Sequence, residues 1–268
     1  MDDLNAPGVR CRPCPEVAPR YIDVSANNTC RVREKIFSHC VKATMKSICV
    51  LIAVCSLCSF LVADEPIRER IEWIDIWVTD ADKEDLPKVL FVGDSITRGY
   101  FGGAEKHLAG KASCARLTTS KCVSDPTFNG DLQLLLKQYK FSVIHFNNGL
   151  HGWGYTEEQY RDGLVKTVMA IKQHAGDAKL IWTTTTPMRK KDDLQVFADD
   201  TSRVKVRNIL AAEVMKDHAA ATDDLFQLVE AHAEWQSTDG VHFNAMGNEA
   251  MAKQVAESVL KHLPSGVK

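Results

Sequence analysis

The chain has 268 residues, of which 45% are hydrophobic and 25% charged, and its formal net charge is −2. This composition is ordinary for a soluble globular protein of one or two domains. Because no basic stripe accompanies the near-neutral charge, the sequence argues against a nucleic-acid partner.

The first 63 residues divide into two segments. Residues 1–44 mix Pro, Cys and Arg without periodicity and offer no hydrophobic core. From Met45, a basic start, an apolar run and a small residue before Asp64 are typical of a secretory signal peptide. We therefore expect residues 1–44 to be a gene-model extension or a disordered stretch, and residues 45–63 to be a signal peptide. The protein would then be secreted or periplasmic, with no stable membrane insertion after cleavage, and membrane-anchored if uncleaved.

Seven of the nine cysteines precede residue 65. Cys11-x-x-Cys14 has the spacing of half a zinc site, but no second cysteine pair follows it at the separation that tetrahedral zinc sites require, so we predict no metal. The other two, Cys114 and Cys122, could bridge in an oxidising compartment or remain as two buried thiols.

Residues 64–87 are charged with scattered aromatics, and we interpret them as a lead-in segment whose tryptophans, Trp73 and Trp77, pack on the domain edge. The apolar run at 89–92 follows and is typical of a strand buried on both faces.

This strand ends at Gly93, and Asp94 and Ser95 follow before a Gly-rich turn. A serine between the carboxyl end of a strand and the start of a helix points into the crevice of an open α/β sheet. The alternative is that Ser95 and Asp94 only cap the next helix.

Strands and helices alternate through the rest of the chain. Further strands are expected at 112–124 (with its loop), 141–147, 178–185 and 219–222, and helices at 104–109, 131–140, after a capping box at 156–159, at 200–216 and at 245–263. The 200–216 helix should bury Val204, Ile209 and Leu210. Together these elements predict a three-layer, flavodoxin-like α/β fold with a mostly parallel five-stranded sheet.

Asp239 and His242 stand three residues apart just before the last expected helix. That spacing can place an orienting carboxylate beside an imidazole base. Together with Gly93-Asp94-Ser95, it resembles the SGNH (GDSL-type) hydrolases, and we assign residues 88–268 to a domain of that type. The resemblance implies that Ser95 attacks an ester carbonyl, His242 takes its proton and Asp239 orients the imidazole.

The resemblance also implies an oxyanion hole, in which this sequence departs from the family pattern. The backbone N–H of Ser95 is the first expected donor. The family has a glycine donor after the second strand, where Ser120 is the nearest match by position. The family's Gly-x-Asn-Asp motif corresponds to residues 149–152, which puts His151 in place of the asparagine donor.

Two alternatives remain open around this motif. His151 could pack under the loop while Asn147 or Asn148 supplies the donor. Trp153 and Tyr155 could stack on a sugar ring as substrate-binding residues, or they could pack a lid.

The sequence thus predicts a secreted serine esterase with no metal or organic cofactor. Its expected substrate is a small-molecule or carbohydrate ester, with a mild preference for short acyl groups on carbohydrate. One alternative is a catalytically inactive SGNH-type domain that binds glycan. A phosphate- or nucleotide-binding flavodoxin-like domain is a second, but it lacks a Walker lysine and leaves Asp239 and His242 without a role.

Overall fold

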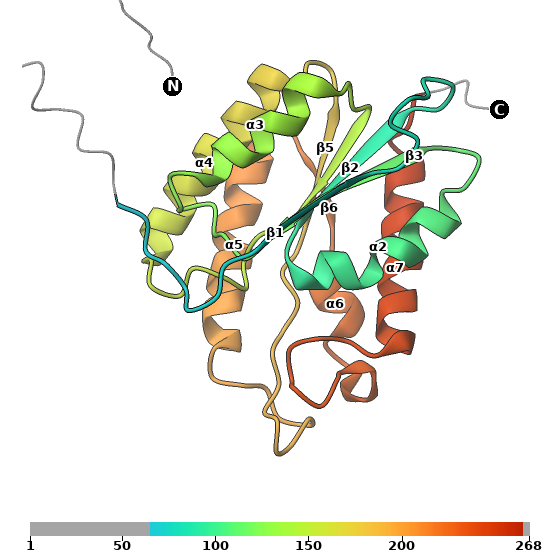
Figure 1. Ribbon diagram of the computed structural model, residues 1–268. Coiled ribbons are helices and arrows are strands. Elements are labelled where there is room, and N and C mark those ends of the chain that lie inside the picture. Colours follow the sequence, from blue (N-terminus) through green and yellow to red (C-terminus); the bar gives the residue numbers. More distant parts are fainter. Residues whose placement is uncertain (1–64, 265–268) are drawn as a thin grey trace, which may run out of the picture. The chain divides into compact units, whose positions relative to one another are not determined.

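The computed structural model describes residues 65–264, so the predicted signal peptide and the segment before it lie outside the described residues. A central sheet is covered on both faces by helices, with α3, α4 and α5 on one side and α2, α6 and α7 on the other (Figure 1). The three-layer α/β prediction is therefore confirmed.

The sheet has six strands in the order β1-β3-β2-β4-β5-β6. They are β1 (Ile74–Val78), β2 (Lys88–Gly93), β3 (Ser113–Thr119), β4 (Val143–Phe146), β5 (Lys179–Thr183) and β6 (Ala221–Asp223). All but β1 run parallel, and their order along the chain is flavodoxin-like. In this topology β2 and β4 are neighbours at the point where the strand order reverses, which is where such sheets bind ligands.

The predicted count of five strands was wrong, because β1 lies within the predicted lead-in segment, 64–87. It pairs antiparallel with β3 at the edge of the sheet. Its backbone bonds hold it there while its side chains stay largely in solvent, with Trp77 56% exposed. An edge strand of this kind buries too little apolar surface to produce a buried-strand pattern in the sequence.

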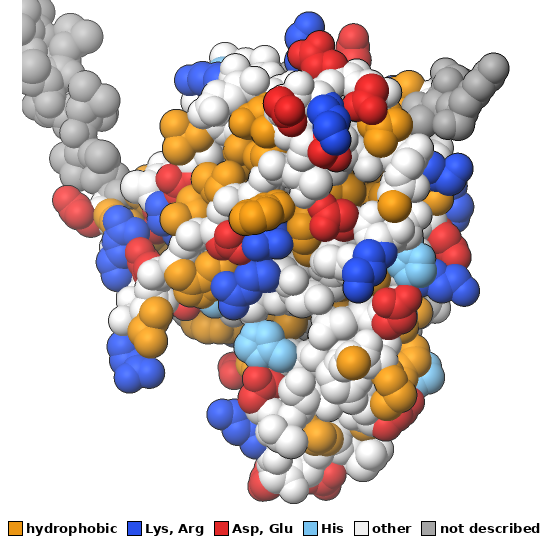
Figure 2. Space-filling model, turned by 45° about the vertical axis from the view of Figure 1, so that its right-hand side comes forward, with side chains coloured by type: hydrophobic (Ala, Val, Ile, Leu, Met, Phe, Trp, Pro, Cys, Tyr) orange, Lys and Arg blue, Asp and Glu red, His pale blue; other side chains and the backbone are white. Residues whose placement is uncertain are grey.

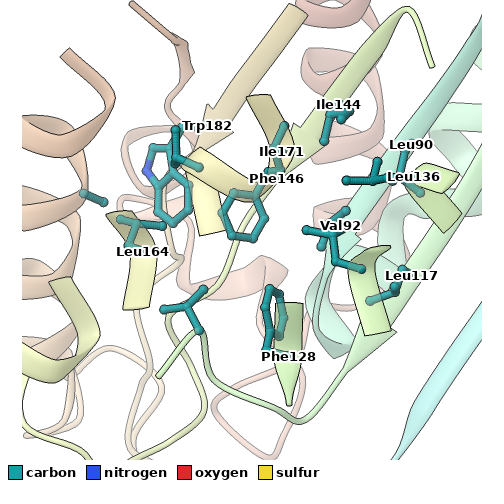
Figure 3. Packing of buried hydrophobic residues seen from close by; sticks show 14 of the residues in the cluster. Leu90, Val92, Leu117, Phe128, Leu136, Ile144, Phe146, Leu164, Ile171 and Trp182 are labelled. Atoms are coloured by element: carbon teal, nitrogen blue, oxygen red, sulfur yellow. The ribbon is translucent and has the colours of Figure 1, made fainter. Parts of the chain in front are cut away.

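The strand that precedes Ser95, β2, is buried along its whole length, as the sequence predicted. Its alternate side chains enter two separate cores. Leu90 and Val92 pack with Phe146 and Trp182 beneath α3 and α4 (Figure 3). Val89 and Phe91 point to the other face, under α2 and α7.

The helices are α2 (Ser95–His107), α3 (Phe128–Gln138), α4 (Glu157–His174), α5 (Thr201–Asp217), α6 (Leu225–Val229) and α7 (Ala245–Leu260), with a short 3-10 turn at Ala233–Trp235. The capping box at the start of α4 is confirmed. The buried face of α5 includes Val204, as predicted, but otherwise differs from the prediction: Ile209 is 61% exposed, whereas Arg207 is fully buried.

Helix α2 begins at Ser95 rather than at residue 104. The sequence favoured a loop because glycines occupy positions 99, 102 and 103. Two of these glycines face α7 instead: a Cβ at Gly99 would lie 2.7 Å from Asn248, and one at Gly103 would lie 2.7 Å from Ala252. The glycines therefore allow close packing of the two helices.

Cys114 and Cys122 are both free and buried, which agrees with the second of the two alternatives for them. Burial raises the pKa of the Cys114 thiol to about 12 and also raises the pKa of Cys122. Neither thiol is therefore poised as a nucleophile.

The visible surface mixes acidic and basic side chains rather than separating them by sign (Figure 2). Within residues 65–264, no helix is both long enough and apolar enough to cross a membrane.

Candidate active site

The structure brings Ser95, His242 and Asp239 together, although the serine and the aspartate are 144 positions apart in the sequence. His242 Nε2 lies 2.8 Å from Ser95 Oγ. On the other side of the ring, His242 Nδ1 lies 2.6 Å from Asp239 Oδ2. This is the arrangement of a nucleophile, a base and a carboxylate that orients the base.

The turn between β2 and α2 holds Ser95. Asp94 caps the helix by accepting a hydrogen bond from Ile96 N at 2.9 Å. The Ser95 N–H stands in the first turn of the helix, where backbone donors have no intrahelical acceptor and the helix dipole favours negative charge. This N–H is therefore suited to an oxyanion.

Asp94 itself is fully buried, and its Oδ2 has no hydrogen-bond partner among the described residues. Burial raises the pKa of this carboxyl, while the nearby rings of His151 and His242 act in the opposite direction.

The loop before α7 holds Asp239 and His242 in position. Asp239 Oδ1 accepts hydrogen bonds from the N–H groups of Val241 and His242, both at 2.9 Å. Partial burial acts to raise the pKa of Asp239, but the hydrogen bonds from the His242 ring and from these N–H groups outweigh it and lower the pKa to about 2. Asp239 is therefore an ionised carboxylate at neutral pH.

Gly240, between the aspartate and the histidine, is required by this loop. Its φ is +73°, and an added Cβ would lie 2.1 Å from the carbonyl oxygen of Arg189. The same close approach carries a hydrogen bond of 2.7 Å from Arg189 N to Gly240 O. A larger residue at position 240 would therefore displace both Asp239 and His242.

The oxyanion role predicted for Ser120 is not supported by its surroundings. Its N–H donates to Trp73 O at 3.1 Å, and its Oγ accepts from Trp73 N at 2.9 Å. These bonds extend the pairing of β3 with β1 beyond the ends of both strands. Because the sequence did not predict β1, it could not indicate that this donor is already in use.

His151 lies in the loop that follows β4, next to the turn that carries Ser95. The two loops are neighbours because β2 and β4 pair directly, with Val92 opposite Phe146. His151 Nδ1 lies 2.9 Å from Glu69 Oε2, and Glu69 Oε1 accepts from Gly152 N at 2.8 Å. Glu69 therefore clamps the loop with both carboxylate oxygens.

Glu69 was missed by the sequence interpretation, which named no partner for His151. Its segment also brings Trp73 to the site. The Trp73 ring meets the His151 ring edge-on at a centroid distance of 6.4 Å, and the Arg98 guanidinium lies 4.5 Å from the Trp73 centroid. No sequence signal identified Glu69, because it lies more than 80 residues from its partners.

The side-chain amides of Asn147 and Asn148 are used within the fold. Asn147 Nδ2 donates to Thr183 O at 2.8 Å and to Thr185 Oγ1 at 3.2 Å. Asn148 bridges to the loop after β3, donating to Lys121 O at 2.9 Å. Both side chains are buried, and their amides hold the loop after β4 to its neighbours.

Two arginines of α5 bind backbone carbonyls of the loop that carries His151. Arg207 donates to Gly149 O at 2.9 Å and to His151 O at 2.7 Å. Arg203 donates to Trp153 O at 2.9 Å, and both arginines pair with Glu157. With the loop carbonyls turned toward α5, the loop is fixed around His151.

The two aromatics predicted as substrate contacts have different surroundings. Tyr155 is buried, and its hydroxyl accepts a hydrogen bond from Ile67 N at 2.8 Å. Trp153 is half-buried, with the guanidinium carbon of Arg207 at 4.8 Å from its ring centroid. Tyr155 thus packs the lead-in segment onto the loop instead of presenting a stacking surface.

Within residues 65–264, no three His, Cys, Asp or Glu side chains are grouped so that they could hold a metal ion.

The sequence matches no protein-family model, and no curated protein is similar enough to count as a relative. Solved structures do match the fold. The carbohydrate acetylesterase Est24 from Sinorhizobium meliloti is 16% identical, with a TM-score of 0.55 over 65% of this chain and 99% of its own. The native aryl esterase from M. smegmatis is 14% identical, with a TM-score of 0.56 over 66% of this chain and all of its own.

A GDSL-like lipase from Bacteroides thetaiotaomicron is similar at the same level: 15% identity and a TM-score of 0.50 over 66% of this chain and 89% of its own. At these identities the similarity establishes the fold, and the activity has to be argued from the site.

Proposed function

We propose that this chain, which has the fold of the SGNH (GDSL-type) hydrolases, is a serine esterase that cleaves acyl esters through Ser95, His242 and Asp239. The observation that carries the proposal is the continuous hydrogen-bonded series from Asp239 Oδ2 through His242 to Ser95 Oγ. It stands beside the carboxyl end of a buried parallel strand, and its carboxylate stays ionised at neutral pH.

In the first half of the reaction, Ser95 Oγ attacks the ester carbonyl while its proton passes to His242 Nε2. The Ser95 N–H and His151 stabilise the oxyanion of the tetrahedral intermediate. The intermediate collapses as His242 returns the proton to the leaving alkoxide, which releases the alcohol and leaves an acyl-serine. Water then attacks the acyl-serine while its proton passes to His242. The second tetrahedral intermediate collapses as His242 returns the proton to Ser95 Oγ, which releases the acid and regenerates Ser95.

Short acyl esters on carbohydrate are the proposed substrate class. The Ser95 side is open, since the side chains of His242 and Asp239 are 46% and 44% exposed. The aromatic ring of Trp73 lies on the lead-in segment and that of Trp153 lies on the same loop as His151, and both remain partly accessible. Est24, which shares the fold, is described as a carbohydrate acetylesterase.

A serine-directed fluorophosphonate probe tests the nucleophile directly. Wild-type protein should be labelled at Ser95, and Ser95→Ala should remain unlabelled with an unchanged circular dichroism spectrum. A panel of nitrophenyl esters and acetylated oligosaccharides then defines the acyl length and the alcohol. The inactive glycan-binding alternative would be favoured if the folded wild-type protein were not labelled and hydrolysed no member of the panel.

We also propose that the chain is exported, because residues 45–63 have the composition of a signal peptide. N-terminal sequencing of the exported protein should find a start near Asp64. Retention of the apolar segment in the mature protein would mean membrane anchoring instead.

A further inference from the structure

Glu69 determines where the proton of His151 resides. An ionised carboxylate can only accept hydrogen bonds, and both of its oxygens are engaged, one by Gly152 N and the other by His151 Nδ1. The proton of that second hydrogen bond therefore belongs to Nδ1. A neutral imidazole carries only one proton, so neutral His151 would have a bare lone pair at Nε2.

A lone pair at Nε2 would repel an oxyanion rather than stabilise it. If His151 is to replace an asparagine donor, Nε2 must carry a second proton, which makes the ring an imidazolium. His242 has the opposite requirement, because it accepts the proton of Ser95 and must start out neutral.

The groups around His151 come from four elements. Glu69 lies on the lead-in segment and Asp94 at the β2–α2 turn, and both are acidic. From α5, Arg207 binds the His151 carbonyl rather than the ring, at 2.7 Å. Arg98 on α2 lies over the Trp73 ring, which meets the His151 ring edge-on. Of these groups, the Glu69 carboxylate is the one that contacts the ring, at 2.9 Å from Nδ1.

We propose that His151 stabilises the oxyanion as an imidazolium, with Glu69 as its positioning residue, so that turnover requires the two site histidines to be in opposite protonation states. This inference rests on the proposed esterase function and specifies how its oxyanion hole works. Activity should be lost at acidic pH as His242 gains a proton and at alkaline pH as His151 loses one. The dependence of kcat/KM on pH should therefore be bell-shaped.

Glu69→Gln provides the decisive variant. The Gly152 N–H can only donate, so the new amide must turn its oxygen toward Gly152 and its NH2 group toward His151 Nδ1. Nδ1 then becomes an acceptor, and neutral His151 carries its proton on Nε2. The variant should therefore keep its activity at alkaline pH where the wild type loses about tenfold per pH unit. Its plateau should be roughly tenfold below the wild-type optimum, because a neutral donor replaces a charged one.

The matched control is Asp75→Asn, which removes the same charge from the same segment. Asp75 pairs with Arg116 and has no contact with His151. This control should keep the wild-type bell shape.

Proton-detected ¹⁵N NMR of the histidine rings gives a readout that needs neither activity nor a variant. In the full wild-type chain His151 should pass from imidazolium to the Nδ1–H tautomer as the pH rises, whereas Glu69→Gln should end in the Nε2–H tautomer. An Nε2–H tautomer of His151 in the wild type would overturn the inference. So would a wild-type kcat/KM that does not fall at alkaline pH, or an alkaline fall that is the same in Glu69→Gln as in the wild type. Those results with normal Ser95 labelling would leave the esterase proposal standing, whereas loss of labelling and hydrolysis in the wild type would remove both.

Discussion

The two sides of Ser95 are built in different ways. On one side, Asp239 and His242 come from a single four-residue stretch whose own backbone hydrogen bonds place the two side chains together. On the other side, His151 depends on Glu69 from the lead-in segment and on Arg207 from α5. The proposed base and carboxylate thus form a local unit. The proposed oxyanion side is instead assembled from residues that are distant in the sequence, and each of them depends on the others for its position.

Removing the nucleophile tests the local unit and should have the largest effect. Ser95→Ala should lower kcat on nitrophenyl acetate by roughly four to six orders of magnitude with an unchanged melting temperature. His242→Ala should do the same, and the double variant should lose little more, because the residues act as one unit. A Ser95→Ala protein that kept a tenth of wild-type turnover would show that another group is the nucleophile.

Removing the side-chain donor tests the long-range side. His151→Ala should lower kcat by about a hundred- to a thousandfold, or about 2.7–4 kcal/mol, with KM nearly unchanged. His151→Asn should recover part of this loss, since it restores an amide donor on a shorter arm.

The controls for His151 are Asn147→Ala and Asn148→Ala, which should mainly lower stability because both amides bind within the fold. A large loss of kcat in a stable asparagine variant, with His151→Ala near wild type, would contradict the assignment.

Arg207→Met should separate the loop from its support. It removes a fully buried cation and leaves the carbonyls of Gly149 and His151 without these donors. We therefore expect the free energy of unfolding to fall by about 3 kcal/mol. Arg203→Met is the matched control, because that side chain is 34% exposed and water can replace its contacts. Urea denaturation should show that Arg203→Met lowers the free energy of unfolding by only about 1 kcal/mol. Equal losses in the two variants would refute this account of Arg207.

Gly240→Ala tests the rigidity of the local unit. The left-handed backbone and the approach to Arg189 O should together cost roughly 2–3 kcal/mol and reduce kcat. Gly110→Ala is the comparison, since Gly110 has a similar φ of +72° but open space around it. Its cost should be about 1 kcal/mol, without effect on kcat. If both variants lost the same stability, the contact with Arg189 would be unimportant.

The smallest expected effect concerns the stability that Asp239 contributes. Its pKa in the folded protein is lowered to about 2, so this contribution is present above the ordinary carboxyl pKa of about 4 and is lost as the pH falls from there toward 2. Because the carboxylate is 44% exposed, the contribution should stay below about 1 kcal/mol. Melting temperatures of wild type and Asp239→Asn should therefore differ slightly at pH 6 and converge near pH 2, and a difference that persists at pH 2 would point to another cause.

The sequence was informative wherever the structure is locally determined. The buried strand before Ser95, the capping box of α4 and the spacing of Asp239 and His242 all arise from neighbouring residues, and each was predicted. It failed where a residue's role comes from a distant partner. Strand β1 is exposed on one side, Glu69 resembles any surface carboxylate, and Arg207 occupies a core position that hydrophobic periodicity assigns to an apolar residue.

The glycines of α2 have a consequence for how the site tolerates change. Gly99 and Gly103 let the helix that starts at the nucleophile press directly on α7, which starts just after the base. The interface between α2 and α7 thus helps to set the distance between Ser95 and His242. A movement of the two helices as one body would therefore carry both residues with it and leave that distance unchanged. Loops on the opposite side of the nucleophile can accordingly diverge and recruit new substrates without putting the proton transfer out of alignment.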